Sequence, residues 1–243
     1  MTRHTRIALP ALIATALLAL TTSARAGDRL TVVELFTSQG CSSCPPADTF
    51  LGELSQRQDI LALSMHVDYW DYIGWKDPFA LPANSERQRT YAHHFGLRYV
   101  YTPQMVVQGQ RQATGSDRDR VLNSISALAD EPTLDLSGHR AADDPGVMVV
   151  DLPESPGTDA VVLAVGFDNA HETRIKRGEN RDRTLRYHNV VRAVTEVGTW
   201  DGHATRLRLS LGDVAPQTDA CAVLVQSRRS GRILGAVRMN LGG

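Results

Sequence analysis

The sequence predicts an α/β domain followed by an all-β domain. In the first half of the chain, strand-like runs alternate with segments of helical period. A Cys-x-x-Cys pair, Cys41 and Cys44, lies between the first strand-like run and the first helical segment. From residue 133 onward the helical period disappears, and short strand-like runs separated by turn residues follow one another. These three observations together predict the two-part organisation.

The composition limits the classes of protein to which the chain can belong. The 243 residues are 42% hydrophobic and 22% charged, which is typical of a globular protein and excludes global disorder. The formal net charge of −1 gives no indication of a nucleic-acid partner or an anionic membrane surface. Three cysteines are too few for a scaffold held together by disulfides.

Residues 1–26 have the pattern of a secretory signal peptide. Arg3 and Arg6 precede an apolar stretch over residues 7–20, and Ala24-Arg25-Ala26 fits a cleavage site between small residues. The apolar stretch is shorter than the ~20 residues that span a bilayer, although an uncleaved anchor is the alternative. We therefore expect a periplasmic or secreted protein with a first domain over residues 27–132 and a second over 133–243, and no further membrane span.

The expected elements of the first domain follow the order β-α-β-α-β-β-α. Residues 31–36 and 60–67 are rich in β-forming residues, and residues 47–54 carry apolar side chains at helical spacing. The second helix is expected to begin at Ser85, with Gln88 completing a capping box, and to end at Gly96. Two short strands, at residues 105–107 and 112–114, and a helix beginning near Ser116 complete the series.

The second domain is expected to be an all-β, sandwich-like unit. Its strand-like runs cover residues 147–152, 160–167, 184–194, 204–211, 221–226 and 233–239. Short strands at this spacing, separated by turn residues, are typical of β-sandwiches. Cys221 lies within one of these apolar runs, which predicts a small buried hydrophobic residue rather than a reactive thiol.

The position of the cysteine pair predicts redox chemistry. A strand that leads through Cys-x-x-Cys into a helix places the first cysteine where the helix N-terminus favours a thiolate. In an oxidising compartment such a pair either cycles or stays oxidised. Thr102-Pro103 directly precedes the third strand, and together with the order of elements it completes the layout of a thioredoxin-like domain.

Longer motifs carry a resemblance to a known family. The segments are VELFTSQGCSSCPPAD at 33–48, HVDYWD at 66–71, YTPQM at 101–105, GENR at 178–181 and NVVR at 189–192. In these segments the chain resembles a bacterial secreted family known as domain of unknown function 1223. The resemblance implies a thioredoxin-like domain with a β-rich extension, and it implies no established activity.

The similarity to thiol–disulfide oxidoreductases implies roles for four residues. Cys41 would be the attacking thiol, Cys44 the resolving thiol, and Pro103 would shape the groove for a protein or small-molecule thiol or disulfide. Glu34 resembles the buried acid beneath the cysteines of such enzymes, and its alternative reading is a strand residue that faces solvent. If the protein is a thiol–disulfide oxidoreductase of this kind, no cofactor is expected.

Two other functions stay open on the same residues. Cys41, Cys44 and His66 could form a copper(I) site, because copper(I) favours thiolates together with an imidazole; alternatively, His66 bonds a loop carbonyl. The disulfide could also be a static staple in a non-catalytic binding module. The charged turn at residues 176–183 is either a solvated hairpin or a segment that docks on the first domain or grips an anionic ligand.

Overall fold

The computed structural model describes residues 29–241, so the predicted signal peptide at residues 1–26 lies outside the described residues. The elements are β1 (Thr31–Thr37), α1 (Pro45–Leu54), β2 (Ile60–His66), a 3₁₀ turn (Asp71–Ile73), α2 (Pro82–His94), β3 (Gln104–Val107), β4 (Arg111–Thr114), α3 (Arg118–Leu128), β5 (Ser137–Arg140), β6 (Val147–Leu152), β7 (Ala160–Arg174), β8 (Thr184–Trp200), β9 (Thr205–Ser210), α4 (Leu211–Val214), β10 (Ala220–Ser227) and β11 (Ile233–Asn240). Within this range, no helix is both long and apolar enough to cross a bilayer.

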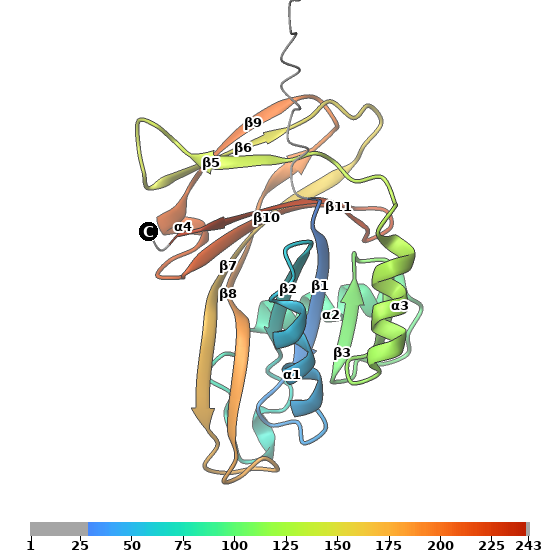
Figure 1. The fold of residues 1–243 in the computed structure, drawn as a ribbon, viewed down its shortest axis with the longest axis vertical. Coiled ribbons are helices and arrows are strands. Elements are labelled where there is room, and N and C mark those ends of the chain that lie inside the picture. The colour runs from blue at the N-terminus through green and yellow to red at the C-terminus, as the bar shows by residue number, and fades with distance from the viewer. Residues whose placement is uncertain (1–28, 242–243) are drawn as a thin grey trace, which may run out of the picture.

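One large mixed sheet runs through both halves of the chain (Figure 1). Its eight strands are ordered β11-β10-β7-β8-β2-β1-β3-β4. Strand β1 pairs with β2 in parallel and with β3 in antiparallel orientation. Strand β8 joins the free edge of β2 in parallel, with Ser64 opposite Val190. The side chain of Asn189 adds a 2.8 Å hydrogen bond to the carbonyl oxygen of Ala62 at this junction.

The predicted fold class, an α/β thioredoxin-like domain followed by a separate all-β, sandwich-like domain, is therefore wrong. Of the described residues 29–241, 40% lie in strands and 19% in helices, so this part of the protein is mostly β. Four strands that follow residue 133 extend the sheet of the first half instead of closing a sandwich of their own. Strand pairing joins residues far apart in sequence, so the local pattern of a strand does not indicate which sheet it enters.

Helices cover both faces of the first-half sheet. Helices α1 and α3 pack against one face, where their apolar side chains meet those of β1, β2 and β3. Helix α2 covers the opposite face, where Tyr91 lies in a core that also contains residues of β7, β8 and β10. A small sheet of order β5-β6-β9 packs on β7 and β10 and buries Cys221, as the sequence predicts.

Helix α2 begins earlier than the sequence predicts. It begins at Pro82, whose missing N–H costs nothing in the first helical turn. The hydroxyl of Ser85 does not cap the helix but donates a 2.5 Å hydrogen bond to a carboxylate oxygen of Asp68. The end of the helix agrees with expectation, because Gly96 takes the left-handed conformation with a φ of 64°.

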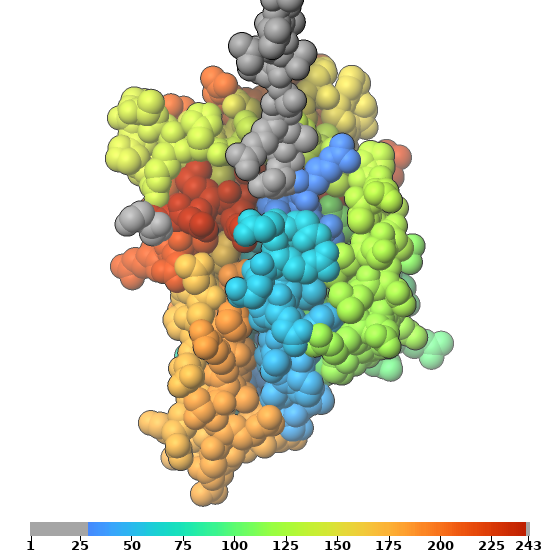
Figure 2. Space-filling view, in the orientation of Figure 1, coloured from blue at the N-terminus to red at the C-terminus, as the bar shows by residue number. Residues whose placement is uncertain are grey.

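The long β7–β8 hairpin brings the second half of the chain to the cysteines. Strands β7 and β8 pair along almost their whole length, and their connecting turn lies beside the loop between β1 and α1 (Figure 1). In the space-filling view the hairpin, in orange, packs directly against α1 in blue (Figure 2). The candidate site is therefore built from both halves of the sequence.

Candidate functional site

Cys41 and Cys44 form a disulfide in the loop between β1 and α1, with their Cα atoms 5.4 Å apart. Cys44 occupies the N-cap position of α1, and Pro45 and Pro46 follow in the first helical turn. Because prolines have no N–H, this helix end offers few free donors to the sulfur of Cys41. Cys41 is 2% exposed and Cys44 is fully buried, so both halves of the disulfide are covered.

The turn of the β7–β8 hairpin covers the cysteine loop. The side-chain amide of Asn180 donates to the carbonyl oxygens of Gln39 and Cys41, each at 2.9 Å. The backbone N–H of Ser42 donates to a carboxylate oxygen of Glu179 at 3.2 Å. Of the two readings of the charged turn, the structure therefore supports docking on the first half of the chain.

The loop that carries the aromatic residues forms a second wall. The indole N–H of Trp75 donates to the side-chain oxygen of Gln39 at 2.8 Å, and the Gln39 backbone N–H donates to Asp77 at 2.8 Å. A Cβ atom on Gly40 would lie 3.2 Å from the Cβ of Trp70, so glycine lets this loop approach the cysteines closely. With the aromatic loop on this side and the hairpin turn on the other, Cys41 is almost completely covered.

A buried carboxyl group, that of Asp48, lies one helical turn after Cys44. Asp48 is 4% exposed, and its Oδ1 accepts a 2.7 Å hydrogen bond from the hydroxyl of Thr37. Burial raises its pKa to about 7, while the nearby imidazole of His66 opposes the rise. Among the described residues, Asp48 Oδ2 and His66 Nε2 are both buried without a hydrogen-bond partner.

His66 forms a buried pair with Asp77 instead of the loop-carbonyl bond that the sequence allows. The distance from His66 Nδ1 to Asp77 Oδ2 is 2.7 Å, and both side chains are fully buried. Burial acts to raise the pKa of Asp77, but His66 and the N–H groups of Gln39 and Phe79 outweigh it and hold that pKa below its usual value. This pair anchors the aromatic loop to the end of β2.

The copper arrangement that the sequence leaves open is not assembled. Cys41 and Cys44 are bonded to each other, and Asp77 occupies the Nδ1 side of the His66 ring. Within residues 29–241, no group of three or more His, Cys, Asp or Glu side chains is placed to hold a metal ion.

Pro103 lies near the first turn of α1, and its peptide bond with Thr102 is cis. A Cβ atom on Gly115 would lie 3.0 Å from the Cβ of Ala47 and 3.2 Å from the Cβ of Pro103, so both residues border the same glycine. The hydroxyl of Thr102 accepts a 2.8 Å hydrogen bond from the indole of Trp70. Trp70 thereby links this segment to the cysteine loop.

Glu34 is not brought to the cysteines. Its neighbours Val33 and Leu35 face α1, so the Glu34 side chain points to the opposite face of the sheet. There it is fully buried, and the guanidinium of Arg87 donates to its two oxygens at 2.5 and 3.1 Å. Neither the predicted role beneath the cysteines nor solvent exposure describes this residue.

Two residues that sequence reasoning missed complete the site, Asp48 and Asn180. The signal for Asp48 is its position four residues after Cys44, which puts it on the same side of the helix. The signal for Asn180 is weaker, because the residue lies within a run of charged side chains that is typical of a solvated turn. Because the neighbouring residues are charged, the sequence gives no indication that the side-chain amide of Asn180 is buried and bonds the cysteine loop.

Comparisons with known proteins identify a family through one family model, and none of them indicates an activity for this chain. A family model described as protein of unknown function (DUF1223) matches residues 32–226. The X-ray crystal structure of protein AGR_C_4864 from Agrobacterium tumefaciens is 34% identical, covers 87% of this chain and 94% of its own, and superposes with a TM-score of 0.76. HBP35 of Porphyromonas gingivalis, at 12% identity, shares the fold alone, with a TM-score of 0.56 over 88% of this chain and 76% of its own. No curated protein matches at a significant level. The chain therefore belongs to the DUF1223 family of proteins of unknown function.

Proposed function

We propose that Cys41 and Cys44 are a reversible redox pair that exchanges with thiols or disulfides of small molecules or proteins. The observation that carries the proposal is the position of the disulfide. It lies at the N-terminus of α1, one turn before a buried carboxyl group whose pKa is about 7. The predicted leader at residues 1–26 supports a site of action in the periplasm or outside the cell.

The exchange consists of two displacements at sulfur. A substrate thiolate attacks Sγ of Cys41, the bond to Cys44 breaks, and a mixed disulfide forms while Cys44 leaves as a thiolate. A second substrate thiolate then attacks the substrate sulfur of the mixed disulfide and releases Cys41. Two substrate thiols are oxidised to one disulfide, and the protein disulfide is reduced to two thiols.

Asp48 supplies the proton balance in this scheme. Cys44 leaves as a thiolate in a buried place, where a negative charge is unfavourable without a proton or a positive partner. A carboxyl group with a pKa of about 7 is protonated in part of the molecules at neutral pH and can give up that proton. The buried position of Asp48 after Cys44 fits this role in a way that Glu34, on the other face of the sheet, does not.

A second function rests on a different observation, the coverage of the cysteine loop. Three hydrogen bonds from Glu179 and Asn180 hold this loop, and Cys41 is only 2% exposed. A disulfide held in this way is also consistent with a structural disulfide, a static staple that does not exchange and only stabilises the fold of a binding module. For redox exchange, the turn of the β7–β8 hairpin has to move away from Cys41.

The two functions differ in how the disulfide reacts while the protein stays folded. The test equilibrates the purified protein with mixtures of reduced and oxidised glutathione or dithiothreitol, traps the thiols with iodoacetamide and counts them by mass spectrometry. An insulin-reduction assay then measures turnover. The redox pair predicts a reversible two-thiol transition in protein that circular dichroism shows to be folded.

The controls use the three cysteines of the chain. The Cys221→Ser variant removes the remaining thiol, which is buried, and should titrate as the wild type does. The Cys41→Ser variant should lose all exchange. If the disulfide is reduced only at the rate at which the protein unfolds, the redox proposal is wrong and the staple is supported.

A further inference from the structure

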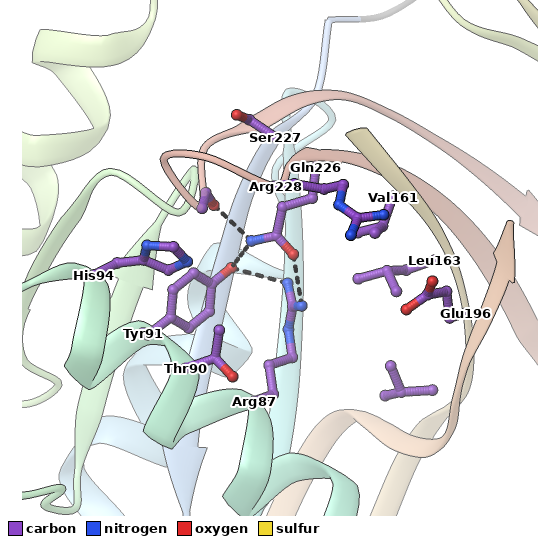
Figure 3. Close-up of a pocket in the computed structure, with 12 residues that line it drawn as sticks. Arg87, Thr90, Tyr91, His94, Val161, Leu163, Glu196, Gln226, Ser227 and Arg228 are labelled. Carbon is purple, nitrogen blue, oxygen red and sulfur yellow. Dashed lines mark hydrogen bonds between the residues drawn. The ribbon is translucent and has the colours of Figure 1, made fainter. Parts of the chain in front are cut away.

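A cavity of about 460 Å³ lies between helix α2 and strands β7, β8 and β10 (Figure 3). It is on the face of the sheet opposite α1. Helix α2 contributes Arg87, Thr90, Tyr91 and His94, which recur at helical spacing along one side of the helix. This volume is within the range of small-molecule binding sites in proteins. The cavity shares no residue with the proposed redox site.

A rigid polar network forms the floor of the cavity. The guanidinium of Arg87 donates to the carboxylate of Glu34, to the side-chain oxygen of Gln226 at 2.8 Å and to the hydroxyl of Tyr91 at 2.9 Å. The amide of Gln226 in turn donates to Tyr91 and to the carbonyl oxygen of Gly231 (Figure 3). Each of these side chains is held by at least two partners, so the floor is organised before any ligand arrives.

This network leaves one donor of Arg87 unused. A guanidinium has five N–H groups, and two of them are on Nη1. Gln226 is the one acceptor for Nη1 among the described residues, so the second N–H of that nitrogen has no partner there. The side chain of Arg87 is 11% exposed, and Arg87 lines the cavity. A largely covered guanidinium with one N–H directed to no protein acceptor, at the floor of a cavity, favours an anionic acceptor in the ligand.

The walls add apolar surface and a second guanidinium. Val161, Leu163 and Val194 form the apolar side of the cavity. Arg228 lies at the edge, 51% exposed, and its Nε is 3.7 Å from the carboxylate of Asp159. At this distance the pair is weak, and Arg228 is free to bond a ligand. Glu196 also lines the cavity and is exposed, so it opposes the approach of an anion.

We propose that this cavity binds a small organic carboxylate with an apolar body. The carboxylate would accept one hydrogen bond from the unused N–H of Arg87 and further hydrogen bonds from Arg228, whose guanidinium can offer two parallel donors. The apolar body would lie against Val161, Leu163 and Val194. An inorganic anion leaves these apolar walls uncovered, and an amine has only donors to offer to the unused N–H groups of Arg87 and Arg228, so neither fits the whole cavity.

The binding test uses hexanoate as the probe. Isothermal titration and ¹H–¹⁵N NMR spectra of the purified protein measure binding of hexanoate, of hexanamide as the neutral control and of hexylamine as the cationic control. The expected result is saturable binding of hexanoate in the millimolar range, with shifts at α2 and β10 and weaker or no binding of the controls. No saturation by hexanoate, or equal binding of hexylamine, overturns the proposal.

Two exposed charges at the edge of the cavity allow variants that leave the fold intact. Arg228→Gln should weaken hexanoate binding roughly fivefold, whereas Glu196→Gln should strengthen it. Arg229→Gln is the matched control, because Arg229 is exposed on the same turn and does not line the cavity. If Arg228→Gln and Arg229→Gln bind hexanoate equally, the carboxylate is not held at this edge, and the proposal is wrong.

Discussion

The side-chain amide of Asn180 donates a 2.9 Å hydrogen bond to the carbonyl oxygen of Cys41, across a sequence separation of 139 residues. The same nitrogen bonds the carbonyl oxygen of Gln39, and Asn180 itself is fully buried. A single side chain from the second half of the chain thus fixes the backbone on which the disulfide is built.

Replacing Asn180 with alanine should destabilise the protein and expose the disulfide. The variant leaves two buried carbonyl oxygens without their donor, which costs about 1–3 kcal/mol of unfolding free energy. Reduction of the disulfide by dithiothreitol in the folded protein should become faster. Chemical denaturation and a thiol-trapping time course measure the two effects.

The matched control for this variant is Asn123→Ala, an exposed asparagine on α3. It should change neither the stability nor the rate of reduction. A reduction rate that Asn180→Ala does not raise would mean that the hairpin turn does not limit access to Cys41.

Replacing Glu34 with glutamine should destabilise the protein without changing disulfide reactivity. The substitution leaves the buried guanidinium of Arg87 without its ionic partner, a loss of roughly 3 kcal/mol. Because Glu34 lies on the opposite face of the sheet, the rate of reaction with dithiothreitol in folded protein should match that of the wild type.

Glu53→Gln provides the comparison for Glu34→Gln. Glu53 pairs with Arg118 on the exposed surface, where both side chains are about half exposed, so its loss should change stability little. If the disulfide of folded Glu34→Gln reacts more slowly with dithiothreitol than that of the wild type, and that of Glu53→Gln reacts at the wild-type rate, Glu34 takes part in the redox chemistry and this prediction is wrong.

Cys41 lies where the sequence predicts, in the loop between β1 and α1, whereas Glu34 does not lie beneath the cysteines. This difference shows which part of the site was predictable. The cysteine spacing and the strand–loop–helix order are local, and the structure confirms both. Strand β1 carries apolar residues on both faces, so its alternation does not show that Glu34 points away from α1. Asn180 reaches the cysteines only through the pairing of β7 with β8, which no local pattern reveals.

The same limit explains the error in fold class. The strand at residues 147–152 was predicted at its observed bounds, and most others of the second half lie within two residues of expectation at their starts. Every residue of β2 is buried, which is typical of an internal strand with a neighbour on each side. The sequence does not indicate, however, that β8 is the second neighbour. The positions of most strands were therefore predictable. Strand β5, helix α4, the extensions of β7 and β8 beyond residues 167 and 194, and the division of the strands between two sheets were not.

The Asp48→Asn variant should make the protein more stable at neutral and alkaline pH. The pKa of Asp48 is raised from 3.8 to about 7, so the folded protein holds a proton that the unfolded chain has released. Stability of the wild type therefore falls as the pH rises from about 4 to about 7 and levels off above that value. Asparagine removes this loss, up to about 4 kcal/mol at alkaline pH.

Urea denaturation across the same pH range checks this expectation. The difference between Asp48→Asn and the wild type should be close to zero near pH 4 and should grow until about pH 7. His66 and Asp77 are the other ionisable groups whose charges act on Asp48, so Asp77→Asn is measured in parallel. A difference that does not depend on pH contradicts the raised pKa.

The Gly115→Ala variant should destabilise the protein by overpacking the contact among α1, β1 and Pro103. A Cβ atom there would lie 3.0 Å from Leu35 and Ala47 and 3.2 Å from Pro103, which predicts a loss of about 1–3 kcal/mol. The control is Gly212→Ala, where the nearest atom lies 3.8 Å away. Equal melting temperatures for the two variants would contradict this close packing.

The parallel seam between β2 and β8 makes the protein a candidate for fragment complementation. A fragment that ends at residue 132 would leave the apolar edge of β2 unpaired, and the remaining fragment would leave the edge of β8 unpaired. The core on the α2 face contains residues of both fragments, so each alone would expose apolar surface. Co-expressed, the two pieces should recombine along this seam and rebuild the disulfide's surroundings, whereas each piece made singly should aggregate.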